Sequence, residues 1–193
     1  MKNLMFLLGL VNALVFSVFS TKCFSCSAKN STKCQKEMEI DCLGDACLIA
    51  SQYFHNGDNS FQSILKGCGD DNVCGAEGSA TGKFSKYRFF ASCCTGNLCN
   101  TGGYTLPVED LTPNGKVCPS CYVKGSTDEC ESNETIKCTG TEIRCFNYRA
   151  SVRNPDNSVV DYSVKGCSNS FGCKINFDHK IGIEELYREK LNC

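Results

Sequence analysis

The sequence predicts an all-β, disulfide-rich protein made of two tandem copies of one small domain. Three observations lead to this fold class. Cysteine accounts for 18 of the 193 residues, a share typical of secreted scaffolds that disulfides hold together. The order and spacing of these cysteines repeat once along the chain. Between the cysteines, segments rich in Tyr, Phe, Val and Ile are separated by turn residues, which favours antiparallel strands.

The chain begins with the features of a cleavable signal peptide. Lys2 is followed by an uncharged, mainly apolar run from Leu4 to Phe19, a pattern typical of secretory signals. The run is short and is interrupted by Asn12, which argues against a membrane-spanning helix. We expect cleavage after Ser20, so that residues 1–20 are removed and the mature protein is secreted. An extracellular location is also oxidising, and disulfides persist there.

The internal repeat is visible in the cysteine spacing. From Cys23 to Cys93, successive cysteines are 3, 8, 8, 5, 21, 6 and 19 residues apart. From Cys118 to Cys193, the spacings are 3, 9, 8, 7, 22, 6 and 20. Both copies contain Lys-Gly-Cys, at 66–68 and at 165–167. Each copy is so small that burial of apolar surface alone leaves little net stability, which is why disulfides are needed.

A linker is predicted between the copies, at residues 101–117. This segment contains three glycines and two prolines and lacks the alternation of apolar side chains that indicates a strand. The chain therefore divides into a signal peptide at 1–20, a first domain at 21–100, the linker, and a second domain at 118–193.

The longest cysteine-free stretches predict β-hairpins. In the first copy, Cys47–Phe54 and Phe61–Leu65 flank a turn. In the second copy, Arg144–Val152 and Ser158–Val164 do the same. The segment Ile183–Leu191 contains strong helix formers, but the repeat aligns it with a predicted strand of the first copy. We therefore expect a strand there as well.

The first copy ends in a specific motif. Cys93–Cys94 is followed by four residues and then by Cys99–Asn100. Together with the Cys-x-x-Cys that opens at Cys23 and the intervening spacings, this motif resembles the three-finger, snake-toxin-like domain of the urokinase-receptor and Ly-6 family. The resemblance covers essentially the whole chain from Lys22 onward. The second copy lacks the final motif, because the sequence stops at Cys193.

The resemblance also implies how the cysteines pair, which their spacing leaves open among many connectivities. It implies five disulfides in the first domain and four in the second, and it uses all 18 cysteines. The implied pairs are Cys23 with Cys47, Cys26 with Cys34, Cys42 with Cys68, Cys74 with Cys93, Cys94 with Cys99, Cys118 with Cys145, Cys121 with Cys130, Cys138 with Cys167, and Cys173 with Cys193.

Several other classes of function are disfavoured. The formal net charge is −1, far from the basic surplus of a nucleic-acid-binding protein. Only two histidines are present, His55 and His179. The sequence contains no nucleophile motif beside Asp178-His179, so we expect no catalytic residue and no cofactor. The Cys-x-x-Cys pairs at Cys23 and Cys118 are compatible with zinc in the cytosol, but the expected compartment favours disulfides over metal.

Two sites of modification and one set of binding residues are predicted. Asn30 and Asn133 are acceptors for N-glycosylation in a secreted chain. Binding is expected on the hairpins, which carry residue types enriched at interfaces. The alternative is that the same aromatic side chains pack the two domains against each other, and the sequence leaves both open. The candidate binding residues are Tyr53, Phe54, Phe61, Phe146, Tyr148, Arg149, Arg153 and Tyr162.

A narrower resemblance is to the gamma-type phospholipase A2 inhibitors, which have two such domains joined by a stretch like Leu106–Pro119. It implies a secreted, non-enzymatic protein that inhibits a secreted phospholipase A2 by protein contact. The amphibian sodefrin-precursor-like factors are also similar, and they imply an alternative: a signalling or pheromone-like ligand of a cell-surface receptor. The polar residues at 187–193 predict no membrane anchor. A surface-anchored receptor needs a further C-terminal tail, and homo- or hetero-oligomerisation is left open.

Overall fold

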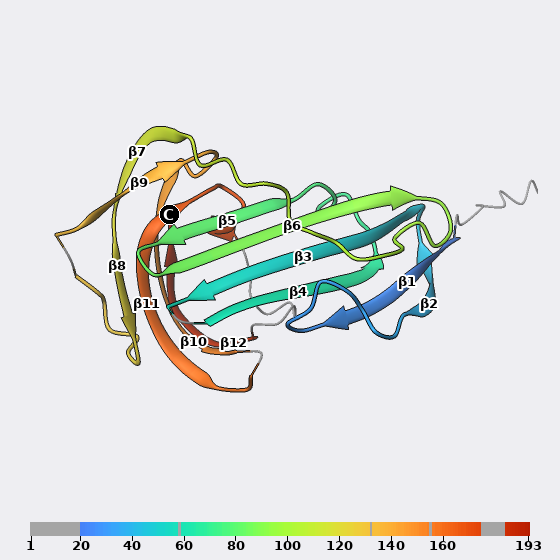
Figure 1. Ribbon diagram of the computed structural model, residues 1–193, viewed down its shortest axis with the longest axis horizontal. Coiled ribbons are helices and arrows are strands. Elements are labelled where there is room, and N and C mark those ends of the chain that lie inside the picture. The colour runs from blue at the N-terminus through green and yellow to red at the C-terminus, as the bar shows by residue number, and fades with distance from the viewer. Residues whose placement is uncertain (1–19, 58, 132, 155, 175–183) are drawn as a thin grey trace, which may run out of the picture.

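The computed structural model describes residues 20–57, 59–131, 133–154, 156–174 and 184–193 (Figure 1). Residues 1–19 of the expected signal peptide and the Asp178-His179 pair lie outside these ranges. Among the described residues are twelve strands and one short 3-10 helix. In this part of the chain, no helix has the length and apolar character needed to cross a membrane.

The first domain contains six strands. They are β1 (Ser20–Ala28), β2 (Met38–Leu43), β3 (Ala46–Asn56), β4 (Asn59–Cys68), β5 (Glu77–Gly82) and β6 (Ser85–Thr95). The second domain contains β7 (Pro113–Pro119), β8 (Cys121–Lys124), β9 (Thr135–Thr139), β10 (Arg144–Arg153), β11 (Val159–Ser168), η1 (Gly172–Lys174) and β12 (Glu184–Asn192). Both predicted hairpins are confirmed, as β3–β4 and β10–β11. The strand expected over Ile183–Leu191 is confirmed as β12.

The predicted linker is too long at its C-terminal end. Pro113–Pro119 forms β7, which pairs with β9, so the linker spans only residues 101–112. Every residue of β7 except Cys118 is exposed, which is why no apolar alternation marks it in the sequence. Gly115, with a φ of +84°, lies within the register shift between Pro113 and Val117 and further disguises the strand.

The two domains share one continuous sheet. Its strand order is β12-β10-β11-β5-β6-β3-β4-β1-β2, and β8 pairs with part of the edge of β11. The junction is between β5 of the first domain and β11 of the second, where Ala80–Gly82 pairs with Gly166–Ser168. Figure 1 shows the strands of the first domain running side by side, with β10, β11 and β12 curving around one end of them. The repeat predicts two similar domains, but not that their sheets join.

The linker crosses the first domain along β6. The ring of Tyr104 stacks on that of Phe90, with centroids 5.9 Å apart. The Arg88 guanidinium donates a hydrogen bond to the carbonyl oxygen of Pro107 at 2.8 Å. These contacts hold the connection between the domains against the sheet.

Nine disulfides join all 18 cysteines. Their pairs coincide with those that the family resemblance implies. In each domain, buried cysteines gather at one end of the strands: Cys23, Cys42 and Cys47 in the first domain, and Cys118, Cys138 and Cys167 in the second. The fold is therefore a disulfide-rich tandem of three-finger domains, in which β1–β2, β3–β4 and β5–β6 are the fingers of the first domain.

Candidate interaction surface

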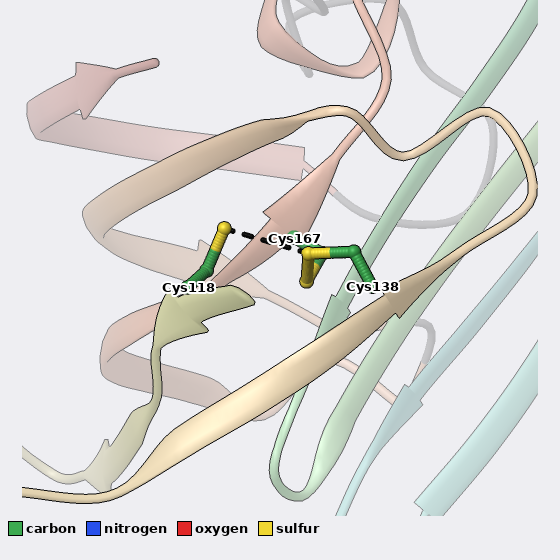
Figure 2. Close-up of side chains that lie close together, drawn as sticks. All are labelled: Cys118, Cys138 and Cys167. Atoms are coloured by element: carbon green, nitrogen blue, oxygen red, sulfur yellow. Dashed lines mark hydrogen bonds between the residues drawn. A yellow bond between two sulfur atoms is a disulfide. The ribbon is translucent and has the colours of Figure 1, made fainter. Parts of the chain in front are cut away.

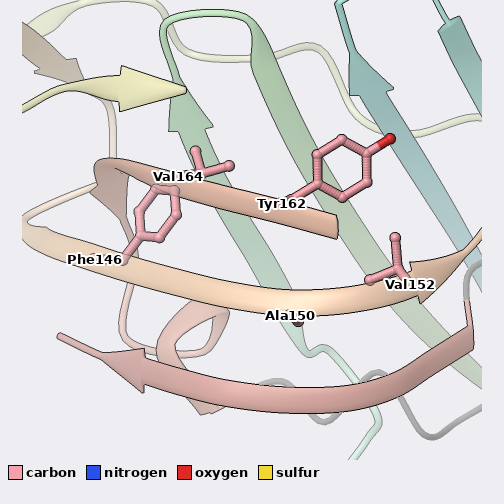
Figure 3. Close-up of a cluster of buried hydrophobic side chains, with 5 residues drawn as sticks. All are labelled: Phe146, Ala150, Val152, Tyr162 and Val164. Atoms are coloured by element: carbon pink, nitrogen blue, oxygen red, sulfur yellow. The ribbon is translucent and has the colours of Figure 1, made fainter. Parts of the chain in front are cut away.

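The aromatic side chains of the two long hairpins meet between the domains. Side chains alternate across a strand, so every second residue of β10 and β11 faces the first domain. From that domain, Phe54 and Ala80 pack against the resulting cluster. Figure 3 shows the buried members of the cluster, which are Phe146, Ala150, Val152, Tyr162 and Val164.

Three of the predicted binding residues pack the domains together. Phe146 is 8% exposed and Tyr162 is 3% exposed, so neither offers a surface to another protein. The ring of Phe54 meets that of Tyr162 edge-on, with centroids 6.5 Å apart. The amide of Asn56 donates a hydrogen bond to the Tyr162 hydroxyl. A small sheet cannot bury its own apolar face, so the two domains cover each other's.

Tyr148 also faces inward, at the margin of this cluster. Its hydroxyl donates a hydrogen bond to Glu185 on β12 at 3.0 Å. Burial raises the pKa of Tyr148, and the Glu185 carboxylate raises it further. Phe61 is half-buried on β4 and lies opposite Phe54 in the strand register. Tyr148 therefore belongs to the contact between the domains, and Phe61 stays a candidate contact residue.

A second part of the domain interface is polar. The Thr81 hydroxyl donates a hydrogen bond to Glu142 at 2.9 Å. The side chain of Asn169 accepts a hydrogen bond from the Ser79 amide at 3.2 Å and donates one to the Glu77 carbonyl oxygen at 2.8 Å. Glu142 is only 4% exposed. Burial raises the pKa of its carboxyl group, and the hydrogen bonds from Thr81 and Ser79 oppose this only in part.

Glu142→Gln is expected to stabilise the protein at neutral pH. Because burial raises the pKa of Glu142, the folded state favours the neutral carboxyl more than the unfolded state does, so ionisation of Glu142 weakens the fold. That loss is absent below the unfolded pKa of 4.5 and complete above the folded pKa. Glutamine stays neutral and still accepts the hydrogen bond from Thr81. The variant should melt about 2 °C higher at neutral pH and match the wild type at about pH 4. A lower midpoint at neutral pH contradicts this expectation.

Arg149 and Arg153 lie on the face of β10 that points away from the buried cluster. The guanidinium of Arg149 lies 3.0 Å from the Glu189 carboxylate, and that of Arg153 lies 3.1 Å from the Glu184 carboxylate. Both glutamates belong to β12. These ion pairs hold the two arginines at defined positions on the side of β10 that points away from the buried cluster.

Glu129 links further cations on this face. Its carboxylate lies 3.0 Å from Nζ of Lys165 and 3.9 Å from Nζ of Lys190. It also accepts a hydrogen bond from the Asn147 amide at 3.0 Å. The hydrogen bond from Lys165, followed by the charges of both lysines, lowers the pKa of Glu129. One acid therefore connects β10, β11 and β12 at the surface.

Tyr187 adds an exposed aromatic ring that the sequence analysis missed. The repeat aligns it with Tyr87, which is buried. In the second domain, however, the pairing of β10 with β12 shifts by one residue between Arg149 and Ala150. The shift places Tyr187 opposite the outward-facing Ser151 and turns its ring outward, where it is 60% exposed. We define the outer face as Asn147, Arg149, Arg153, Lys165, Tyr187 and Lys190.

In the first domain, Tyr53 is half-buried on the face of β3 opposite Phe54. His55 lies two residues further along the same strand. Its Nδ1 is 2.9 Å from the Ser60 hydroxyl of the paired strand. This contact satisfies the ring nitrogen within the hairpin. Because Tyr53 faces away from the buried cluster, it stays a candidate contact residue.

Cys118, Cys138 and Cys167 bring three sulfur atoms within 4.8 Å of one another (Figure 2). Sulfur binds metal ions as a thiolate. Here Cys138 is bonded to Cys167, and Cys118 is bonded to Cys145. The cluster is thus a contact between two disulfides, with Sγ atoms of Cys118 and Cys138 3.4 Å apart, and it offers no thiolate ligand.

Both predicted glycosylation acceptors are exposed. Asn30 lies just after β1 in a left-handed turn with a φ of 54°, and Asn133 precedes β9. Their exposure is compatible with modification, and occupancy of the two sites stays a prediction.

Comparison with known proteins identifies the family. The family model described as u-PAR/Ly-6 domain matches residues 20–102 and 114–193. The chain is 30% identical over 150 residues to Ly6/PLAUR domain-containing protein 8 from Bos taurus, covering 75% of this chain and 60% of that protein. It is 29% identical over 163 residues to the urokinase plasminogen activator surface receptor from Bos taurus, covering 79% and 46%. It is 32% identical over 130 residues to a phospholipase A2 inhibitor of the gamma type from Elaphe climacophora, covering 63% and 60%.

The chain therefore spans between about half and three fifths of the length of these relatives. Two separate matches to the family model, one in each domain, together account for most of the sequence. This protein belongs to the uPAR/Ly-6 family.

Proposed function

We propose that this protein is a secreted, non-enzymatic binding protein that inhibits a secreted phospholipase A2 by protein contact. The similarity to a phospholipase A2 inhibitor supports this choice of partner. The observation that carries the proposal of a binding role is the outer face of the second domain. There, an exposed tyrosine lies between two arginines that ion pairs hold in place.

The composition of the outer face suits protein recognition. Tyrosine and arginine are among the residue types that often dominate binding energy, because each combines a large apolar area with directional hydrogen bonding. Ser151 lies between Arg149 and Arg153 on β10, and it faces Tyr187 across the strand pair. The surface is part of a sheet that disulfides hold in place, so little ordering is needed when a partner binds.

The test is a titration of the mature chain, beginning at Thr21, against a panel of secreted phospholipases A2, with binding and residual activity both recorded. We expect a Kd below about 1 μM and loss of enzyme activity for at least one member. Tyr187→Ala and Arg149→Ala should each weaken binding about tenfold or more. Arg144→Ala is the charge-matched control, since Arg144 is exposed at the start of β10 and does not belong to the outer face.

Two outcomes change the interpretation. If Tyr53→Ala weakens binding as much as Tyr187→Ala, the contact extends to the first domain. If the folded, fully oxidised protein binds no phospholipase, the inhibitor proposal is wrong. The alternative of a signalling or pheromone-like ligand is then tested by receptor-dependent responses of cells to the same protein.

A further inference from the structure

The contact between the domains provides a template for a second docking edge. On β11, Gly166–Ser168 pairs with β5 of the first domain. A Cβ atom on Gly166 would lie 2.1 Å from the carbonyl oxygen of Thr81 and 2.9 Å from the Cα of Gly82. No side chain fits there. The glycine at this position therefore marks the place where the backbone of another domain docks.

The first domain has the same Lys-Gly-Cys at the corresponding end of β4, with Gly67 in the place of Gly166. On one edge of β4, β3 pairs with Gly67 through Leu48. On the other edge, β1 pairs only with residues 64–66. Within the described ranges, no strand pairs with Gly67 on that second edge.

Nothing in the described part of the first domain requires a glycine at this position. A Cβ atom on Gly67 would meet no atom within 4 Å, and Gly67 is absent from the residues with positive φ. Gly69 differs, because its Cβ would lie 2.9 Å from the Cys93 sulfur. Gly67 thus forms an open strand edge without a side chain, as Gly166 would if β5 were removed.

The side chains at both ends of the nearby strand β2 are exposed as well. In the second domain, the docked β5–β6 finger is held by an ion pair between Lys83 and Glu134 at 2.5 Å. The repeat aligns Glu134 with Met38 of the first domain. Met38 is 67% exposed, and Leu43 at the other end of β2 is 84% exposed. A finger that docks here meets the apolar Met38 at the position where the second domain has Glu134.

We propose that the edge of β4 at Gly67 docks the third finger of a uPAR/Ly-6 domain on a separate polypeptide, as β11 docks β5. This chain's own β5 is covered by β11, so the occupant is the third finger of another uPAR/Ly-6 domain. Its docking strand carries small residues, as Ala80–Gly82 does; in the template, a Cβ atom on Gly82 would lie 2.9 Å from the Val164 side chain. Its tip carries an apolar residue in place of Lys83, which matches Met38.

The probe is a cyclised hairpin peptide of residues 77–90 carrying Lys83→Leu, labelled with a fluorophore and titrated with the full chain. Binding is followed by fluorescence anisotropy. We expect the peptide to bind the wild type and to bind Gly67→Val about tenfold more weakly, since strand addition needs close backbone approach. Asn59→Val is the control, because it places the same side chain at an exposed position of the same strand, away from the docking edge.

A second arm leaves the protein unchanged and so does not depend on the folding of the variant. In the contact between β5 and β11, the Thr81 carbonyl faces β11. The N–H and the carbonyl of a strand residue point to the same edge of the strand. A methyl group on the Thr81 nitrogen of the peptide therefore blocks the edge that docks. We expect the methylated peptide to lose binding. No binding of the unmethylated peptide to the wild type overturns the proposal. Equal binding to the wild type and Gly67→Val, or equal binding of both peptides, overturns it too.

Discussion

Gly166→Val is expected to separate the two domains and to destabilise the protein by about 3 kcal/mol. The new Cβ would lie 2.1 Å from a backbone oxygen of β5, and a backbone cannot move aside as a flexible side chain can. Separation exposes the buried cluster around Tyr162 and breaks the hydrogen bonds of Asn169 to β5. Thermal unfolding measures the loss of stability. Limited proteolysis of the linker at 101–112 and small-angle scattering measure the separation.

Gly67→Val is the matched control for this prediction. It makes the same substitution in the same Lys-Gly-Cys sequence of the other domain, where the added atoms meet open space. We expect its melting temperature and its linker cleavage to equal those of the wild type. If both variants lose stability equally, the glycine serves the individual domain, and its role in the contact between domains is contradicted.

Asn100→Ala is expected to destabilise the first domain by about 3–5 kcal/mol. Asn100 is buried, and its side chain makes three hydrogen bonds to the backbone. It accepts one from the Phe24 amide at 3.0 Å and donates to the carbonyl oxygens of Phe24 and Leu48, both at 2.9 Å. Alanine leaves these three groups without their partner. Because β1 and β3 lose a shared anchor, we expect a lower unfolding midpoint in urea and faster amide exchange in β1.

Two further variants separate the hydrogen bonds of Asn100 from its volume. Asn97→Ala removes an exposed asparagine whose side chain accepts one hydrogen bond from the Lys22 amide, and it should cost about 1 kcal/mol or less. Asn100→Asp keeps the shape but places a carboxylate beside two carbonyl oxygens, which raises the pKa of that carboxyl group. Its stability should therefore increase as the pH falls, because the protonated acid can donate again. A pH-independent loss contradicts the hydrogen-bond explanation.

Most of the strands could be predicted from the residues. The hairpins β3–β4 and β10–β11 combine β-branched and aromatic residues with turn residues, a local signal that needs no knowledge of the tertiary fold. For β12, local propensity favours a helix, and only the comparison with the first copy predicted the strand. The exposed strand β7 was missed, because a strand without a buried face leaves no periodic pattern.

The candidate surface could be predicted only in part. The alternation of side chains along β10 places Phe146 and Arg149 on opposite faces of the sheet. It does not reveal which face meets solvent and which face meets another domain. The outward position of Tyr187 could not be predicted for a different reason. Its outward position depends on a one-residue shift in the pairing of β12 with β10, and such a shift has no signature in the sequence.

The number of domains, the need for disulfides and the positions of most strands could be predicted without a structure, since they follow from cysteine spacing and local patterns. The disulfide pairing required a family resemblance. The folded chain was needed to show that the two sheets join at Gly166, and that Phe54, Phe146 and Tyr162 face the other domain instead of a partner. The physical reason is that these features depend on how two preformed surfaces fit, and that fit is a property of residues far apart in the chain.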